Sequence, residues 1–307
     1  MIARIPGASA LRQLAALLLA PVLLLALAGC SDASVQREPA NPLLYELASA
    51  DGMVEGWMLG TIHALPEGTE WRTPEIERTI AGADLLVVEV ATLRDEAGIA
   101  RTFTDLASTP GLPPLKARVP ADLAGPLAAL MQRGDLSPQR FAGTETWAAA
   151  LQLARIDAVG DPANGVDRAL LADFAASGRP VRELEGAATQ LAIFDRLPEP
   201  GQRAMLAAVV RESAAPGRDP ERLQRAYLAG DTATLEASTR EGLLADPALH
   251  EALLAARNRR WAEALAPILA ARPRPLIAVG AAHLVGPEGL AALLQARGYR
   301  VRRLPAR

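Results

Sequence analysis

Short apolar runs and turn signals along the chain predict a set of strands. Residues 85–88 and 276–279 are apolar throughout, which is typical of strands buried on both faces of a parallel sheet. Residues 43–47 and 57–62 flank an Asp-Gly turn signal and predict a hairpin. Polar and apolar positions mix in residues 179–185, which predicts a strand at the edge of the sheet.

Helical spacing dominates the rest of the chain. It predicts helices at residues 74–81, 121–133 and 144–155, and another that begins around residues 164–167. Between residues 186 and 271 only helices are predicted, and this block is expected to form a layer or cap over the sheet. Its helices are 187–196, 201–213, 220–228, 232–244 and 247–270, with Pro267 expected to kink or end the last one early.

These elements together predict an α/β fold with a mixed, largely parallel central sheet, flanking helices and a large helical insertion or cap. A single domain is expected from residue 43 to residue 304. Its last unit is strand, turn, helix and strand: Gly280 ends the run 276–279, Gly286-Pro287 is expected to open a helix, and Gly298 ends that helix. His283 then lies just past the strand, at the end of the sheet where α/β proteins bind ligands.

The N-terminal 29 residues predict export. They contain two arginines, no acidic residue and a long apolar run that is short for a membrane anchor, as in a secretory signal peptide. The run ends in Leu27-Ala28-Gly29-Cys30, which resembles the lipobox of bacterial lipoproteins. That resemblance implies cleavage before Cys30, a lipid on this residue and, from Ser31, an outer-membrane location facing the periplasm. Residues 30–42 are polar and rich in proline, which indicates a tether between lipid and domain.

Two of the three histidines stand in the same local pattern. Gly60-Thr-Ile-His63 follows a predicted strand, and so does Gly280-Ala-Ala-His283. A single histidine after a strand is more often a hydrogen-bonded structural residue than a ligand. The pairing of His63 and His283 in equivalent positions nevertheless points to a joint site.

Carboxylates are also predicted at strand ends. Glu89 follows the run 85–88, and a buried carboxylate needs a cation or another partner; alternatively, it leaves the sheet and meets water or an arginine. Glu185 is predicted at the end of the edge strand. Asp167 falls in the first turn of a helix, where a carboxylate complements the helix dipole, and this structural role is sufficient to explain it.

One stripe of the helix 247–270 combines apolar and polar residues. Leu254 and Trp261 indicate that the stripe is buried, so Asn258 within it needs hydrogen-bond partners. Arg257 lies at its margin. For both residues a functional role and a structural role, in a helix-to-sheet hydrogen bond or a surface ion pair, are open. His250 is interpreted as a partly exposed residue of the first helical turn.

Charge and missing motifs narrow the chemistry. The formal charge is −3 (32 basic, 35 acidic) and becomes −5 (30 basic, 35 acidic) without Arg4 and Arg12, and the signs are mixed, which argues against nucleic-acid binding. The only cysteine is Cys30, so thiol catalysis and disulfides are excluded, and no serine-hydrolase elbow, phosphate loop or His-Glu-x-x-His is found. Two histidines and one carboxylate remain, the ligand set of hydrolytic metal sites.

Several motifs together resemble those of the TraB/GumN family, the bacterial relatives of the TIKI metalloproteases. The resemblance covers residues 43–304 and implies a fold akin to erythromycin esterase and the haem-binding lipoprotein ChaN. It implies a site of His63, Glu89, Arg257 or Asn258, and His283, and metal-dependent peptidase activity as in the animal members. The chain departs from the pattern at Leu184-Glu185-Gly186, where a threonine is expected after the glutamate. The motifs are Gly60-Thr-Ile-His63, the strand ending in Glu89, Asn164-Gly-Val-Asp167, Glu183-Leu-Glu185, Arg257-Asn258 before Trp261, and the C-terminal unit around His283.

Two hypotheses follow from these observations. The first is a periplasmic, lipid-anchored metallohydrolase that acts on peptides, with His63, Glu89 and His283 as ligands of zinc, manganese or cobalt, all equally suited to this set. Glu185, or Glu89 if it is not a ligand, would then transfer a proton. The second is a non-catalytic lipoprotein that binds a peptide, a metal or haem.

Overall fold

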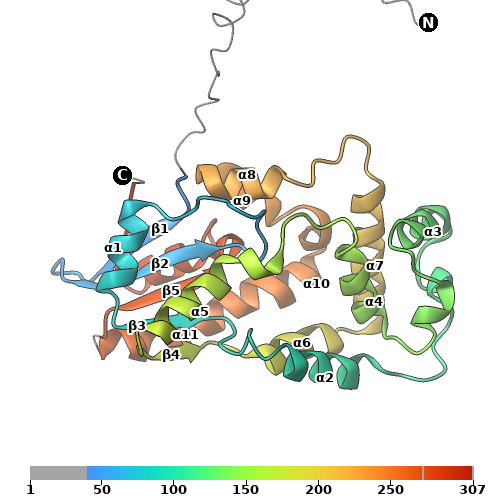
Figure 1. The fold of residues 1–307 in the computed structure, drawn as a ribbon, viewed down its shortest axis with the longest axis horizontal. Helices are drawn as coiled ribbons and strands as arrows, with labels where there is room; N and C mark the ends of the chain where they lie inside the picture. The colour runs from blue at the N-terminus through green and yellow to red at the C-terminus, as the bar shows by residue number, and fades with distance from the viewer. Residues whose placement is uncertain (1–39, 272, 306–307) are drawn as a thin grey trace, which may run out of the picture. The chain divides into compact units, whose positions relative to one another are not determined.

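A six-stranded sheet organises the part of the chain that the structure describes. The computed structural model describes residues 40–271 and 273–305, which fall within one compact unit, Pro39–Arg307. The strand order is β4-β3-β5-β2-β1-β6, and β4, β3, β5 and β2 run parallel, while β1 pairs antiparallel with β2 and β6 (Figure 1). The mixed, largely parallel sheet of an α/β fold is confirmed. The strands are β1 Leu44–Ala48, β2 Val54–Thr61, β3 Leu85–Val88, β4 Val181–Glu183, β5 Pro275–Gly280 and β6 Arg300–Arg303.

The apolar pattern explains the position of each strand. All residues of β3 are buried, as are all of β5 except Gly280, because both strands are flanked on both sides within the sheet. The predicted hairpin forms between β1 and β2, and Gly52 in its turn has φ +89°, a conformation that favours glycine. The mixed pattern of residues 179–185 gives the edge strand β4, as predicted.

Two groups of helices accompany the sheet. Helices α1, α5, α8, α9, α11 and α12 contribute apolar side chains to one core with the strands. Helices α2, α3, α4 and α7, with Leu249 of α10, build a second core, which lies beyond the arrowhead of β2 in Figure 1. This second group of helices therefore stands at the carboxyl ends of the strands. The predicted helical block 186–271 is divided between the two cores, because its helices α8, α9 and α11 pack against the sheet. The helices are α1 Pro74–Gly82, α2 Glu96–Ala107, α3 Ala124–Arg133, α4 Thr146–Ala154, α5 Val166–Ala176, α6 Ala187–Asp195, α7 Glu199–Ala214, α8 Arg222–Ala229, α9 Thr232–Ser238, α10 Pro247–His250, α11 Ala256–Ala270 and α12 Leu290–Ala296.

Two expectations about helix boundaries were wrong, those at the end of α9 and at the start of α12. Helix α9 ends at Ser238 instead of residue 244, and the Thr239 hydroxyl donates to the Glu236 carbonyl (2.7 Å) at this end. Helix α11 ends at Ala270, as predicted, and Pro267 does not end it early, since buried side chains on either side of the proline hold the last turn against the core. Helix α12 begins only at Leu290, since Gly286-Pro287 belongs to a preceding turn.

The predicted signal peptide, residues 1–29, and Cys30 lie outside the described residues. So does most of the predicted tether 30–42, but its last residues are fixed to the domain. Asn41 donates its main-chain N–H to Leu228 of α8 (2.6 Å), and Arg303 of β6 donates to the Asn41 carbonyl (2.8 Å). Over residues 40–271 and 273–305, none of the helices has the length and apolar character needed to cross a bilayer.

Candidate active site

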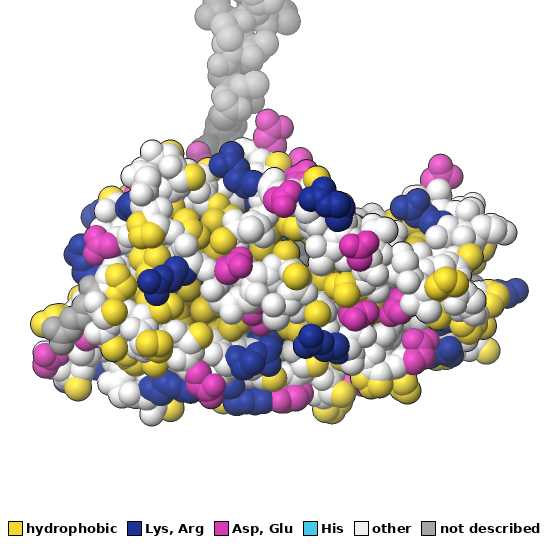
Figure 2. Space-filling model, turned by 90° about the horizontal axis from the view of Figure 1, so that it is seen from below, with side chains coloured by type: hydrophobic (Ala, Val, Ile, Leu, Met, Phe, Trp, Pro, Cys, Tyr) yellow, Lys and Arg dark blue, Asp and Glu magenta, His cyan; other side chains and the backbone are white. Residues whose placement is uncertain are grey.

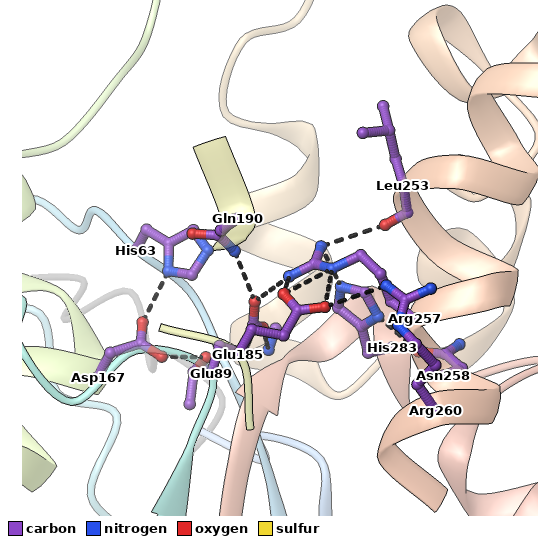
Figure 3. A network of polar contacts seen from close by, with 12 residues as sticks. His63, Glu89, Asp167, Glu185, Gln190, Leu253, Arg257, Asn258, Arg260 and His283 are labelled. Carbon is purple, nitrogen blue, oxygen red and sulfur yellow. Dashed lines mark hydrogen bonds and ion pairs between the residues drawn. The ribbon is translucent and has the colours of Figure 1, made fainter. Parts of the chain in front are cut away.

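The four polar residues predicted at strand ends lie at one rim of the sheet. His63 comes two residues after β2, Glu89 directly follows β3, and Glu185 comes two residues after β4. His283 ends a short 3-10 turn, Ala281–His283, that follows β5. Because these four strands are parallel, their carboxyl ends share one edge of the sheet, and the close-up in Figure 3 shows their side chains around a common region.

The glycines of the repeated motif permit close approaches of the main chain. A Cβ atom at Gly60 would lie 3.2 Å from the Cα of Ala281, so β2 and the turn that carries His283 pack closely together. The main-chain N–H of Gly280 donates to Glu89 Oε1 (2.8 Å). A Cβ atom at Gly165 would come within 2.4 Å of the His63 carbonyl oxygen, so this glycine allows α5 to approach His63. In each motif, glycine brings the histidine close to its neighbours.

Glu89 is a buried carboxylate whose two oxygens accept from three donors. Its Oε1 accepts from the Gly280 N–H, and its Oε2 accepts from Arg257 Nη2 (2.8 Å) and Gln190 Nε2 (3.1 Å). Burial opposes ionisation of Glu89. Positive charge outweighs burial and lowers the pKa of Glu89 to about 2: His283 contributes once it is protonated in acid, and Arg257 contributes at every pH. Glu89 is therefore a carboxylate at neutral pH, and the arginine partner considered from the sequence is Arg257.

Arg257 joins two carboxylates and an imidazole. Its Nη2 donates to Glu89 and, at 2.8 Å, to Glu185 Oε2, while its Nε also faces the Glu185 carboxylate (3.0 Å). Its Nη1 donates to the Leu253 carbonyl (3.1 Å) and to His283 Nε2 (3.3 Å). All three charged side chains are under a tenth exposed. Arg257 thus bridges two buried carboxylates and offsets one of their two negative charges.

A π-helical turn precedes Arg257. Residues Glu251–Ala255 form this turn between α10 and α11, and the Ala256 N–H bonds back to the Glu251 carbonyl, five residues earlier. Such turns inside helices occur frequently at functional sites. Here a single residue separates the turn from Arg257 and Asn258. These two consecutive side chains point about 100° apart around α11, and both contact residues at the rim.

Asn258 determines the tautomer of His283. Its Nδ2 donates to the main-chain carbonyl of Glu288 (2.8 Å), so its Oδ1 faces His283 Nδ1 at 2.6 Å. An amide oxygen only accepts, and His283 Nδ1 must therefore carry the hydrogen. Burial lowers the pKa of His283 to about 4, so the ring is neutral and its Nε2 keeps a lone pair.

His63 is in the opposite protonation state. Its Nδ1 lies 2.8 Å from Asp167 Oδ2, and the other oxygen of Asp167 accepts from the Thr61 hydroxyl (2.7 Å). The charge and hydrogen bond of Asp167 raise the pKa of His63 to about 9. The His63 side chain is 69% exposed, whereas that of Asp167 is 6% exposed, so His63 presents a proton to solvent.

The predicted metal site does not fit this arrangement. Among the described residues, no group of three His, Cys, Asp or Glu side chains is placed to hold a metal ion. Both Glu89 oxygens already accept from N–H donors, and the cation between Glu89 and His283 is the guanidinium of Arg257. A metal on His63, Glu89 and His283 would require Arg257 to leave its position.

Three residues of the network were not predicted for this role. The sequence explained Asp167 by the helix dipole, but Asp167 also orients His63. Its place two residues after a glycine, at the start of α5, was the feature of the sequence that could have indicated this second role. His250 is partly exposed, as interpreted, but its Nε2 also contacts Glu288 (2.7 Å), which the sequence did not indicate. Gln190 of α6 donates to Glu89, and no local pattern pointed to it.

Comparison with known proteins agrees with the motifs. The model of the TraB/PrgY/gumN family matches residues 43–303. The chain belongs to this family. It is 26% identical over 248 residues to the uncharacterized protein YbaP of Escherichia coli K12, which covers 78% of this chain and 87% of YbaP. The same identity and coverage hold for YbaP of Shigella flexneri. No solved structure matches.

Proposed function

We propose that this member of the TraB/PrgY/gumN family is a hydrolase that cleaves peptide or related acyl bonds at the rim of the sheet. One observation carries the proposal: the two equivalent histidines have opposite partners, since His63 pairs with the Asp167 carboxylate (2.8 Å) while buried His283 faces the Asn258 amide oxygen (2.6 Å), and these surroundings raise the pKa of His63 and lower that of His283. Titratable groups whose environments separate their pKa values in this way are the usual signature of an acid and a base in one site. At neutral pH, His283 is the base and His63 is the acid.

The contacts assign a role to each side chain. His283 Nε2 would accept a proton from the attacking water once its contact with Arg257 opens, and at 3.3 Å this is the longest polar contact that Arg257 makes. The exposed imidazolium of His63 would donate a proton to the leaving group. Arg257 would place a fixed positive charge beside the oxygen that becomes negative in the transition state. Glu89 and Glu185 hold Arg257 in position.

A cavity beside Glu185 offers room for a substrate. Its volume is about 400 Å³, and it is lined by residues that follow β3 and β4 and by the first turns of α2 and α6. It therefore lies at the same rim of the sheet, and it meets the network of Arg257 through Glu185, while neither histidine lines it. Its polar lining, which includes Thr102, Glu183 and Thr189, suits a hydrophilic substrate such as a peptide.

Binding of the divalent metal predicted from the sequence is a separate proposal, and the acid–base reaction of the two histidines does not require it. Zinc, manganese or cobalt would bind through His63, Glu89 and His283 only after Glu89 exchanged Arg257 for the metal. A metal would then supply a nucleophile by lowering the pKa of bound water. The present contacts support the acid–base reaction that the two imidazoles perform without it.

A non-catalytic binding lipoprotein is the second candidate, and one observation favours it. Glu89, Glu185 and Arg257 are under a tenth exposed, and their charges are already paired with one another within the protein. In that case the rim would present mainly His63 to a bound peptide, metal or haem.

We further propose that the protein is anchored in the cell envelope by a lipid on Cys30 and faces the periplasm, at the outer membrane. Nucleic acid is not a proposed partner. Figure 2 shows basic and acidic side chains interspersed over the face that it draws, with no broad patch of basic side chains there.

One experiment tests the hydrolase proposal against both alternatives. The purified protein, its metal content measured, is incubated with a peptide library, with and without a chelator, and the products are identified by mass spectrometry. We expect cleavage that survives the chelator and is lost in the variants His283→Ala and His63→Ala. Loss of cleavage with the chelator would favour the metal-dependent reaction, and peptide binding without cleavage would favour the binding protein.

A further inference from the structure

His250 belongs to a chain of contacts that ends at the proposed base. It is the last residue of α10, and its Nε2 lies 2.7 Å from Glu288 Oε2. Its Nδ1 lies 2.9 Å from the Thr239 carbonyl oxygen, so the ring is held from both sides. The His250 side chain is 18% exposed. The contact between His250 and Glu288 attaches α10 to the loop that connects the turn of His283 to α12.

The loop that carries Glu288 is a tight turn. Gly286 has φ +75°, in the region that favours glycine, and the Gly289 N–H donates to the Gly286 carbonyl (3.1 Å). A Cβ atom at Gly289 would lie 2.4 Å from the Val285 carbonyl oxygen. The turn therefore directs the main-chain carbonyl of Glu288 toward Asn258 Nδ2, 2.8 Å away.

This carbonyl decides which way the Asn258 amide faces. A carbonyl oxygen accepts hydrogen bonds and cannot donate them, so the amide must turn its NH₂ group toward Glu288 and its oxygen toward His283. The opposite orientation would bring two oxygens together at Glu288 and place an NH₂ group against His283 Nδ1. His283 would then carry its hydrogen on Nε2 and lose the lone pair that faces Arg257.

We propose that Glu288 and His250 are positioning residues that set the tautomer of His283. The contact between the Glu288 carboxylate and His250 fixes the position of Glu288, so that its main-chain carbonyl accepts from Asn258. Asn258 in turn accepts from His283 Nδ1 and holds the hydrogen on that nitrogen. Asn258 is fully buried, so no water at its side chain competes with this carbonyl. The consequence for catalysis rests on the proposed function, whereas the tautomer itself does not.

Nuclear magnetic resonance of the full-length protein labelled with ¹⁵N-histidine tests the proposal, because the chain has only three histidines to assign. In the wild type, we expect His283 to show a hydrogen-bearing Nδ1 and a bare Nε2 at neutral pH. In Glu288→Ala and in His250→Ala, the ratio of the Nε2–H to the Nδ1–H form should rise about tenfold, the typical effect of one hydrogen bond. Glu288→Gln, whose amide oxygen still accepts from His250, should preserve the wild-type ratio.

The control variant is Glu236→Ala. The Glu236 side chain belongs to α9 and lies beside Gly286 of the loop that carries Glu288, but it takes no part in the contacts that join His250, Glu288, Asn258 and His283. This variant should leave the tautomer unchanged. A hydrogen on Nε2 of His283 in the wild type would overturn the proposal even if a variant failed to fold. So would an unaltered ratio in both Glu288→Ala and His250→Ala. If the ratios behave as expected but no substrate is cleaved, the hydrolase proposal fails and the positioning role stands.

Discussion

Replacing Glu89 by glutamine removes one buried negative charge and changes the shape of the side chain little. Glu89 is 5% exposed and accepts from Arg257, Gln190 and the Gly280 N–H. The fall of its pKa from the ordinary 4.5 to about 2 corresponds to at most about 3 kcal/mol of folding free energy at pH 7, at about 1.4 kcal/mol for each pH unit, because His283, one source of the shift, is neutral there. Breaking a buried ion pair independently costs about 3–5 kcal/mol. We therefore expect Glu89→Gln to lower the free energy of unfolding by about 3 kcal/mol at pH 7.

The dependence on pH makes this prediction specific. A carboxylate whose pKa is lower in the folded state contributes stability above its unfolded pKa, and this contribution disappears as the pH falls through the folded value. The difference between wild type and Glu89→Gln should hence shrink between about pH 4.5 and pH 2. Urea denaturation followed by tryptophan fluorescence at several pH values measures it.

An exposed glutamate provides the control. Glu77 is 52% exposed and pairs with Arg72 at 3.0 Å, so Glu77→Gln should cost less than about 1 kcal/mol at any pH. A Glu89→Gln variant as stable as the wild type at pH 7 would refute the central position of Glu89. A loss that stays constant down to pH 2 would show that shape rather than charge is responsible.

Further predictions concern His63 and the cavity. In Asp167→Asn, the pKa of His63 should return from about 9 toward its ordinary 6.5, which a histidine titration by NMR detects. The stability that the pair of His63 and Asp167 contributes in the wild type should be complete below pH 6.5 and should be lost as the pH rises through about 9. An unchanged titration would exclude Asp167 as the cause. Filling the cavity beside Glu185 by Thr102→Trp should raise KM about tenfold or more at unchanged kcat. Thr104→Trp, on the exposed side of α2, should alter neither KM nor kcat. Equal effects of the two substitutions would exclude the cavity as the substrate site.

The convergence of the strand-end residues could be predicted from the sequence. Buried apolar runs, such as residues 85–88, indicate parallel strands, and parallel strands place their carboxyl ends at one rim. His63 and His283 follow from this rule together with the Gly-x-x-His repeat. The rule concerns the backbone, however, and does not state which side chain pairs with which.

The partners of the site residues could not be predicted, because they depend on how distant elements pack. Arg257 reaches Glu89 and Glu185 across the rim, and the π-helical turn before it interrupts the regular spacing from which its position was inferred. Of the partners that the sequence left open for Glu89, the structure shows the arginine. Gln190 and His250 joined the network through packing alone.

Local signals also competed at the start of α12. Gly286-Pro287 has the composition of a helix start, but Gly286 adopts a positive φ and Gly289 closes the turn, so the helix begins at Leu290. Both the helix-start signal and the turn signal were present in the sequence. Only the contact between Asn258 and Glu288 shows why the turn prevails, since the turn directs the Glu288 carbonyl to that amide.

The pH dependence of kcat/KM for a cleaved peptide, measured with and without a chelator, tests the acid–base assignment most directly. With His283 as the base and His63 as the acid, we expect a broad plateau that falls below about pH 4 and above about pH 9, unchanged by the chelator. A single rise near pH 7 that the chelator abolishes would instead indicate metal-bound water, and it would contradict the assignment of the two imidazoles.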